Sequence, residues 1–397
     1  MDSSILNVRQ DIQFNDVIKK KEFYGYLPYA GTKFGNNDEI RISIQAQDVY
    51  TLIAESYVYV SGKFTSTDKD AHLVNNCIAH LFSEIRFELN NVVLDRVKDP
   101  GITSTLKGLV SFTQNDELAL SVAGWHHVLP QYIKADDGYF EARIPLNILL
   151  GFAETYKKVT LNCKQELILL RAHTDDNAYL GKDGKFEIYG VEWLVPQIDV
   201  NDEYKLKILR TIKTDRPIQL AFRSWELHDL PSMKETSVDK WAIRTTNQLE
   251  KPRYVIVAFQ TDRKNVKTKN ASEFDHANVR NIKLYLNSDS YPYLNQELNF
   301  KTGKYSSAFY AYAAFQSSYY GIQGSNPLQN MGLFKTCPVF VIDCSHQIED
   351  IKTGSVDVQI ELEANEKFPA KTVAYALIIH DQQFEYSPLS GLVRKLI

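Results

Sequence analysis

Side chains that could bind a metal ion or take part in catalysis occur along the chain only in short, isolated groups. Trp125-His126-His127 offers two imidazoles, but adjacent residues on a strand point to opposite faces and rarely share one ion. Asp175-Asp176-Asn177 resembles the start of a calcium loop, yet the glycine and the closing glutamate of such a loop are missing. We therefore expect a structural role for the histidines and a polar turn for the acidic run.

A nucleophile stands beside a histidine at Asp343-Cys344-Ser345-His346. Members of a catalytic triad are seldom sequence neighbours, and the chain has no Gly-x-Ser-x-Gly turn, so the end of a strand is the better interpretation. Glu361 and Glu363 are two residues apart and so share one face of a strand. A glycosidase needs its two carboxylates at a defined separation across a cleft, and a solvated strand face is the default for this pair.

The four cysteines Cys77, Cys163, Cys337 and Cys344 lie far apart and form no C-x-x-C pair. We expect four free, mostly buried thiols rather than disulfides or a zinc site. Asn270-Ala271-Ser272 fits the glycosylation pattern, but without an export signal we expect it to be unmodified. The sequence thus predicts no catalytic residue, no cofactor and no metal site.

The overall charge argues against a protein that binds nucleic acid over its whole surface. The 397 residues carry 45 Lys and Arg against 49 Asp and Glu, a net charge of −4, whereas phosphate binding needs a concentrated positive field. Lys19-Lys20-Lys21 is the one basic triplet, and acidic residues around it balance the first 40 residues. The N-terminus lacks the pattern of a secretory signal, and no apolar run is long enough to span a membrane.

The aromatic content is the unusual part of the composition, with 23 Tyr and 20 Phe against 3 Met. Such a composition favours β structure. Most of these rings should line cores, while a minority could seal contacts between subunits. The candidates for such contacts are Phe23, Tyr24, Tyr26, Tyr29, Tyr319 and Tyr320. Packing on their own domain is the alternative for the first four.

Strand patterns dominate both halves of the chain. Ile40, Ile42 and Ile44 alternate with polar residues, as in a half-buried strand. Asn90-Asn91 separates two strand runs and suits the left-handed conformation of a hairpin turn. The predicted strands are Ile40–Gln47, Tyr57–Phe64, Ile85–Leu89, Val92–Val97, Gln165–Arg171, Phe186–Val195, Ile218–Trp225, Lys240–Thr246, Tyr254–Gln260, Asn281–Asn287, Val339–Asp343, Ser355–Glu363 and Thr372–His380.

Helical patterns are few and short. Thr103–Phe112 follows Pro100-Gly101, and Leu146–Phe152 follows Pro145, a residue that suits a first helical position. Tyr305–Tyr320 ends at Gly321, a helix stop signal.

Internal repetition is the most informative pattern. Tyr57-Val58-Tyr59-Val60 corresponds to Tyr254-Val255-Ile256-Val257, and Ile85–Asn91 corresponds to Ile282–Ser288. Both offsets are 197 residues, close to half the chain. Chance similarity between strands is the alternative, but the agreement of the two offsets favours the duplication of one domain.

These patterns predict an all-β fold of two tandem eight-stranded jelly rolls with a few short helices in the connections. We expect an N-terminal arm at 1–39, a first jelly roll at 40–200, a linker helix at 201–214, a second jelly roll at 215–384 and a C-terminal tail at 385–397.

The chain resembles the major capsid proteins of the double-jelly-roll lineage, in particular those of Polinton/Maverick elements, adintoviruses and virophages. The resemblance covers nearly the whole chain and consists of strand, turn and aromatic patterns in a fixed order. The stretches that carry it are Asn76–Val97, Ile144–Phe152, Leu167–Arg171, Leu286-Asn287 with Tyr291-Pro292, Gln316–Gly321, Val341–Ser345 and Ala374–Asp381.

The resemblance implies a structural protein without catalytic activity. Its relatives form homotrimers, whose six jelly rolls make pseudo-hexagonal capsomers. Neighbouring capsomers tile an icosahedral shell around double-stranded DNA, and a separate single-jelly-roll penton protein occupies the vertices. A virion capsid, assembled inside the host cell, would be its location. The lack of a basic arm suggests that it contacts DNA only indirectly.

Two other functions remain compatible with a pair of jelly rolls, because one fold hosts many functions. One is a glycan-active enzyme of the amidase type, with acidic residues between its two domains. The other is a carbohydrate-binding protein.

Overall fold

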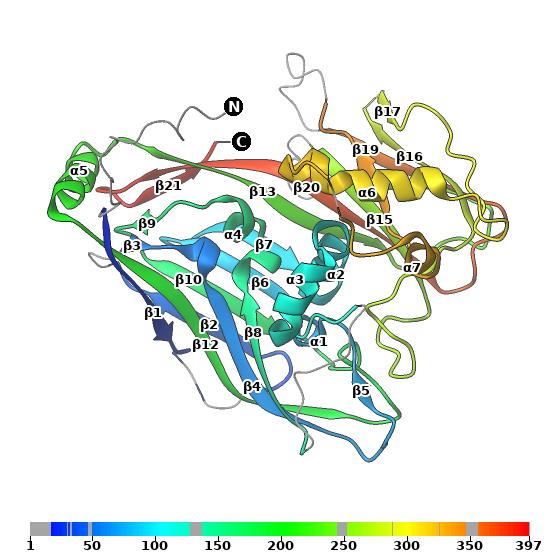
Figure 1. Cartoon of the computed structure of the whole chain (residues 1–397), viewed down its shortest axis with the longest axis horizontal. Helices are drawn as coiled ribbons and strands as arrows, with labels where there is room; N and C mark the ends of the chain where they lie inside the picture. Colours follow the sequence, from blue (N-terminus) through cyan, green and yellow to red (C-terminus); the bar gives the residue numbers. More distant parts are fainter. Residues whose placement is uncertain are drawn as a thin grey trace, which may run out of the picture.

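The fold is a pair of β-sandwiches joined by one helix, in a computed structural model (Figure 1). The structure describes residues 17–29, 31, 34–46, 50–127, 137–243, 252–287, 289–324, 326–346 and 356–396. Parts of five predicted elements lie outside these residues: the N-terminal arm, the strands Ile40–Gln47, Lys240–Thr246 and Ser355–Glu363, and the C-terminal tail.

The described residues of the first half form twelve strands, in two main sheets and a short two-stranded sheet. One sheet has the order β8-β4-β12-β3-β9, with β1 paired to β12; the other has the order β2-β10-β6-β7; β5 pairs with β11. The strands are β1 (Ile18–Tyr26), β2 (Glu39–Ile44), β3 (Tyr50–Thr51), β4 (Tyr57–Thr65), β5 (His72–Leu73), β6 (Phe82–Leu89), β7 (Val92–Lys98), β8 (Tyr139–Pro145), β9 (Thr160–Leu161), β10 (Gln165–Arg171), β11 (Tyr179–Leu180) and β12 (Lys185–Val200).

The second half repeats this plan. One sheet has the order β13-β20-β15-β18, with β21 paired to β20, and the other has the order β14-β19-β16-β17. The strands are β13 (Ile218–Leu230), β14 (Val238–Ile243), β15 (Pro252–Thr261), β16 (Val279–Leu286), β17 (Asp289–Tyr291), β18 (Phe340–Asp343), β19 (Val358–Ala364), β20 (Thr372–Ser387) and β21 (Leu392–Lys395).

The helices lie in the connections. They are α1 (Cys77–His80), α2 (Pro100–Ser111), α3 (Gln114–Leu120), α4 (Gly151–Thr155), α5 (Asp202–Lys213), α6 (Ser306–Tyr320) and α7 (Met331–Thr336), with short 3-10 turns at Ile53–Glu55, Ser121–Ala123 and Leu146–Ile148. The predicted helices at 103–112 and 305–320 are confirmed as α2 and α6, and the segment after Asn201 is the helix α5. The predicted helix at 146–152 is two pieces, a 3-10 turn and α4.

Local sequence explains several boundaries. Asn90 and Asn91 both adopt positive φ, at 47° and 64°, in the turn between β6 and β7, so the predicted hairpin is confirmed. Gly321 ends α6 in the left-handed conformation, which glycine adopts without a steric penalty.

The duplication is visible in the strand pairing. β4 and β15, which carry the first repeated motif, each pair with the longest strand of their half, the 16-residue strands β12 and β20. β6 and β16, which carry the second, each lie between the next strand of the same hairpin and a strand from later in the same half: β7 and β10 for β6, β17 and β19 for β16. The strands that carry the two motifs have corresponding pairing partners in both halves, which confirms that the two halves share one fold.

Several strands lie where the sequence predicted none: β3, β5, β8, β9, β11 and β17 in the connections, and β1 and β21 in the two terminal segments. β1 falls within the expected N-terminal arm, yet it pairs with β12 from Ile18 to Tyr26. β21 falls within the expected C-terminal tail and pairs with the end of β20. Both segments therefore extend sheets.

The core runs through both halves as one cluster of buried apolar residues. Within the first half, Phe87 of one sheet packs edge-on against Trp193 of the other, with ring centroids 6.2 Å apart. In the second half, α6 covers the outer side of the β15 sheet, where Phe315 packs against Tyr254 at 5.2 Å (Figure 1). This helix also reaches the first half, and the contacts there form the candidate site.

Candidate functional site

Several polar contacts between distant parts of the chain lie where α6 of the second half meets α2 of the first. The Tyr312 hydroxyl donates to the Leu109 carbonyl at 2.9 Å. The Gln316 amide donates to the carbonyls of Ser111 and Phe112 at 3.2 and 3.1 Å. These carbonyls belong to the C-terminal end of α2, where helix carbonyls lack partners within the helix. The second half thus caps a helix of the first.

A buried ion pair lies beside this contact. Lys107 of α2, only 3% exposed, places its Nζ 2.6 Å from Glu154 Oε1 of α4. Two tyrosines of α6 close the pair: the Tyr319 hydroxyl donates to Glu154 Oε2 at 2.7 Å, and the Tyr320 hydroxyl contacts both charged groups. Burial lowers the pKa of Lys107, and the carboxylate of Glu154 opposes that shift.

Aromatic faces complete the surroundings of the lysine. Its Nζ lies 4.5 Å from the ring centroid of Tyr319 and 5.0 Å from that of Trp225. A cation over an aromatic face is stabilised by the ring quadrupole. Burial and the nearby Glu154 carboxylate raise the pKa of Tyr319, so its hydroxyl stays protonated and can act as a donor.

A second buried carboxylate joins β7 to β13. Asp95, 2% exposed, accepts a hydrogen bond from Ser224 Oγ at 2.6 Å and one from the Phe152 backbone N–H at 2.8 Å. Burial raises the pKa of Asp95, and these hydrogen bonds act in the opposite direction. One side chain thereby ties a strand of the first half to a strand of the second.

Backbone and rings pack closely at the same place. A Cβ on Gly151 would lie 1.9 Å from the Arg223 carbonyl oxygen, so only glycine allows α4 to approach β13 this closely. Next to it, Phe152 lies 5.0 Å from Phe87 and 5.1 Å from Phe222. The two sandwiches therefore share an apolar core as well as hydrogen bonds.

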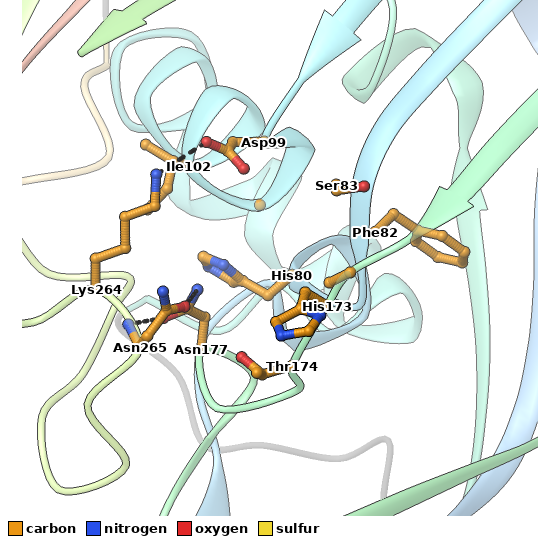
Figure 2. Close-up of a pocket in the computed structure, with 12 residues that line it drawn as sticks. His80, Phe82, Ser83, Asp99, Ile102, His173, Thr174, Asn177, Lys264 and Asn265 are labelled. Atoms are coloured by element: carbon orange, nitrogen blue, oxygen red, sulfur yellow. Dashed lines mark hydrogen bonds and ion pairs between the residues drawn. The ribbon is translucent and has the colours of Figure 1, made fainter. Parts of the chain in front are cut away.

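A small polar cavity lies at the opposite end of the contact between the halves (Figure 2). Lys264 and Asn265 of the second half reach Asp99 at 3.1 Å and Asn177 at 3.0 Å. The cavity is about 190 Å³, below the roughly 300 Å³ of an ordinary small-molecule site. These two pairs of lining side chains bond across the two halves, so the cavity is part of the joint between them.

His80, which lines this cavity, is buried and bonded within the chain. Its Nε2 lies 3.0 Å from Ser272 Oγ, and Ser272 donates in turn to the Asn75 carbonyl. Burial lowers the pKa of His80 to about 4, so the ring is neutral near pH 7.

The histidines singled out for metal binding have structural roles. His126 contacts the Gly124 carbonyl through Nδ1 at 2.8 Å, and His127 contacts the Gln329 amide through Nε2 at 3.0 Å. No group of three His, Cys, Asp or Glu side chains that could hold an ion occurs in the part of the chain that the structure describes.

The acidic run at 175–177 is a turn that fastens the two halves. Asp175 pairs with Arg171 at 2.9 Å inside the first half. Asp176 reaches Lys267 at 3.7 Å, and Asn177 bonds Asn265, both in the second half. The prediction of a polar turn agrees with these contacts.

The residues Asp343 to His346 follow the end of β18, as the sequence predicted. Asp343 accepts hydrogen bonds from Ser318 at 2.7 Å and from the Ser345 backbone at 2.9 Å. Cys344 is buried and its thiol contacts the Pro252 carbonyl. All four cysteines are free and buried, which confirms the prediction for the thiols.

Three of the candidates for subunit contacts are exposed on the first half. Phe23 and Tyr24 of β1 are 48% and 45% exposed, and Tyr29 is 67% exposed. Tyr26 is half-buried, and its hydroxyl accepts a hydrogen bond from Gln197. The exposed rings leave apolar surface open to solvent on one edge of the first sandwich.

Tyr319 and Tyr320 occupy a different setting. Tyr319 is buried against Glu154, and the Tyr320 hydroxyl bonds the same carboxylate. The expectation that Tyr319 faces another subunit does not fit its buried position, whereas Tyr320 is 38% exposed while its hydroxyl bonds Glu154. Two of the residues that hold the halves together, Lys107 and Glu154, had one usable signal, since each is a charge between uncharged neighbours; Asp95 adjoins Arg96 and had none.

The sequence profile of the double jelly roll-like domain matches residues 71–384, most of both sandwiches. The chain belongs to the double jelly roll-like family. A search of curated protein sequences finds no match. In the described part of this double jelly roll, no helix is long and apolar enough to cross a membrane.

Solved structures of viral proteins share the double jelly roll over its full length. VP54 of PBCV-1, fitted into a reconstruction of the virophage Sputnik, aligns with a TM-score of 0.64 at 10% identity, covering 98% of this chain and 99% of that one. A chain from the Sputnik virophage structure gives 0.62 at 7% identity over 100% and 92%. The mavirus major capsid protein gives 0.55 at 11% identity over 98% and 92%. The predicted fold class is thereby confirmed.

Proposed function

We propose that this double jelly roll is a major capsid protein, the structural subunit of an icosahedral shell of a DNA virus or virus-like element. The observation that carries the proposal is the alignment over nearly the full length of both chains with VP54 of PBCV-1 and with the mavirus major capsid protein. The alignment spans both sandwiches and the connection between them. A fold can host several functions, but these relatives use the same tandem arrangement in capsids.

The subunits would assemble as homotrimers. Two similar sandwiches per chain give six similar units in a ring of three copies, and such a ring closes through heterologous contacts. Exposed aromatic residues at Phe23, Tyr24 and Tyr29 suit that role, since tyrosine and phenylalanine are enriched in interfaces. Trimers would pack beside one another as capsomers, with a separate single-jelly-roll penton protein at the vertices.

Contact with packaged DNA would be indirect. The net charge is −4, and the basic triplet Lys19-Lys20-Lys21 adjoins Glu22. A shell of such subunits would enclose double-stranded DNA without gripping it. The location that follows is the virion capsid, assembled within the host cell.

Within the double jelly roll-like family, we propose that the chain belongs with the capsid proteins of Polinton/Maverick elements, adintoviruses and virophages. The chain covers 92% of both the Sputnik and the mavirus chains, which fits a subunit without large insertions. We also propose the division into jelly rolls at 40–200 and 215–384 around a linker helix at 201–214, with β1 and β21 extending the sheets.

Catalysis is not part of this proposal. A glycan-active enzyme of the amidase type would need accessible acidic residues between its two domains. The carboxylates described between the two halves are engaged, Asp95 by Ser224 and Glu154 by Lys107. A monomer that cleaves glycopeptides, or binds glycans on an array, would support the alternatives.

The mass and shape of the purified protein test the proposal. We expect light scattering to give three chains of 45.5 kDa each and negative-stain microscopy to show hexagonal capsomers or closed shells. A monomer that persists across salt concentration and pH would contradict it.

A further inference from the structure

β1 of the first half and β13 of the second half hold the same position in their sandwiches. Tyr57 pairs with Leu194 as Tyr254 pairs with Ile379, so β12 and β20 can be aligned residue by residue. Val195 and His380 are the next residues along β12 and β20, so they correspond. Tyr24 of β1 pairs with Val195, and Ser224 of β13 pairs with His380. Tyr24 is therefore the counterpart of Ser224.

The two strands differ in what covers them. Ser224 is 7% exposed and Phe222 is 4% exposed, because β7 and α4 of the first half lie against β13. In β1 every residue from Ile18 to Gly25 is exposed. Tyr24 itself is 45% exposed. β13 is buried at the joint between the two sandwiches, whereas the corresponding edge of β1 is exposed to solvent.

β7, the strand on the other side of the joint, also has a counterpart in the second half. Asp95 of β7, which binds Ser224, lies opposite Phe87 in the β6–β7 hairpin. Leu284, the counterpart of Phe87 at the offset of 197, lies opposite Tyr291 of β17. Tyr291 is thus the counterpart of Asp95.

The surface around Tyr291 is apolar and uncovered. Tyr291 is only partly buried, while Tyr293 and Leu294 just beyond it are 84% and 75% exposed. Large exposed aromatic and aliphatic side chains that lie together commonly mark a protein contact. β17 and β1 lie on opposite sides of the chain in Figure 1, so one copy cannot bring its own two surfaces together.

We propose that β1 of one copy docks beside β17 of a second copy, in a contact that repeats the joint between β13 and β7 inside each chain. Tyr24 would then face Tyr291 of the neighbouring copy, as Ser224 faces Asp95. The two surfaces differ, so the contact is head-to-tail, and three copies joined by it would close into a ring if each is rotated by a third of a turn from the last. The inference rests on the proposed function, because it supplies the contact that a ring of three subunits needs.

A cross-link between two single-cysteine variants tests this contact. The four native thiols are buried, so Tyr24→Cys and Tyr291→Cys each add one accessible thiol. We expect the mixed variants to form a covalent dimer that contains one chain of each kind, on mild oxidation or with a short bismaleimide. A chain that carries both substitutions should give covalent trimers.

Tyr189→Cys mixed with Tyr291→Cys is the matched control, because Tyr189 is a tyrosine of the first half with 48% exposure on β12. The control pair should cross-link at least tenfold less. Trimers in light scattering without the Tyr24–Tyr291 product, or with equal product in the control, would overturn the contact and leave the capsid proposal standing. A sample that is monomeric throughout would overturn both.

Discussion

Lys107 and Glu154 form a buried ion pair at the joint between the two jelly rolls, with 2.6 Å between Lys107 Nζ and Glu154 Oε1. Both belong to the first half, yet the hydroxyls of Tyr319 and Tyr320 of the second half donate hydrogen bonds to the Glu154 carboxylate. The joint therefore depends on polar groups that only the assembled pair of sandwiches can satisfy. Such an arrangement fixes the relative position of the halves, a property that a shell subunit needs.

Removal of one member of the ion pair should destabilise the chain strongly. Lys107→Met leaves the Glu154 carboxylate buried without its cation, which typically costs about 3–5 kcal/mol. The double variant Lys107→Met with Glu154→Leu should recover part of that loss, since no unpaired charge remains. Urea unfolding followed by tryptophan fluorescence measures the effect.

The exposed helical pair Lys207 and Glu203 supplies the control. It lies at 2.7 Å on α5 with both side chains more than half exposed, and such pairs contribute about 0.3–0.5 kcal/mol. Lys207→Met should therefore leave the unfolding midpoint nearly unchanged. Equal losses in Lys107→Met and Lys207→Met would contradict the role of the buried pair.

Gly151→Ala should separate α4 from β13. The added Cβ would lie 1.9 Å from the Arg223 carbonyl oxygen, and backbone cannot yield as a flexible side chain does. Overpacking of this kind costs about 1–3 kcal/mol, measurable as a lower melting temperature. Gly332→Ala is the comparison, because its Cβ meets only the Asn330 side chain at 3.2 Å and should change stability by less than about 1 kcal/mol. Equal shifts would contradict the close approach.

Acid should weaken the fold between pH 6.5 and about 4. The pKa of His80 is about 4 in the folded chain because of burial, against 6.5 when exposed. The unfolded state then binds more protons in this interval, so stability is full above pH 6.5 and falls as the pH drops toward 4. A shift of this size corresponds to at most about 3 kcal/mol.

The variant His80→Gln should show a shallower loss of stability over the same interval. The pKa values of His127 and His380 are also lowered to about 4 by burial, so part of the slope remains. The exposed His72 offers the control His72→Gln, with the wild-type slope expected. Urea midpoints at several pH values measure the slopes, and an unchanged slope in His80→Gln would contradict the assignment.

The four thiols should resist modification in the folded chain. Burial raises the pKa of Cys77, Cys163 and Cys337 to about 12, and the thiolate is the reactive form. At pH 8 a thiol reagent should label no cysteine quickly, and all four in denaturant. Rapid labelling of any thiol in folded protein would contradict the burial.

The sequence was sufficient for the repeated architecture but not for the joint between its halves. Asn90-Asn91 and Gly321 mark a turn and a helix end through backbone conformation alone. Both features could therefore be predicted from a few neighbouring residues. The contact of Asp95 with Ser224 joins residues 129 positions apart. No local pattern encodes such a distance.

The strands that the sequence did not predict have two different reasons. β1 is exposed from Ile18 to Gly25 and carries three lysines, so it lacks the alternation of a half-buried strand. β8 does alternate, with Phe140, Ala142 and Ile144 buried; this strand was missed although its pattern is that of a half-buried strand. Exposure of β1 is itself informative, because it marks the edge at which a partner is expected.

Tyr24→Lys should weaken the association of subunits without unfolding them. A lysine at this position of β1 would place a fourth positive charge beside Lys19, Lys20 and Lys21, against a surface that the proposed contact buries. We expect at least a tenfold weaker association, about 1.4 kcal/mol, measured as mass against concentration by light scattering. Tyr189→Lys, at a tyrosine of similar exposure, should leave the mass unchanged. Because Tyr24 is exposed, both variants should keep the melting temperature of the dissociated wild-type chain. A lower melting temperature in Tyr24→Lys would show a folding defect instead. A Tyr24→Lys variant that still forms the full trimer would contradict the role of β1.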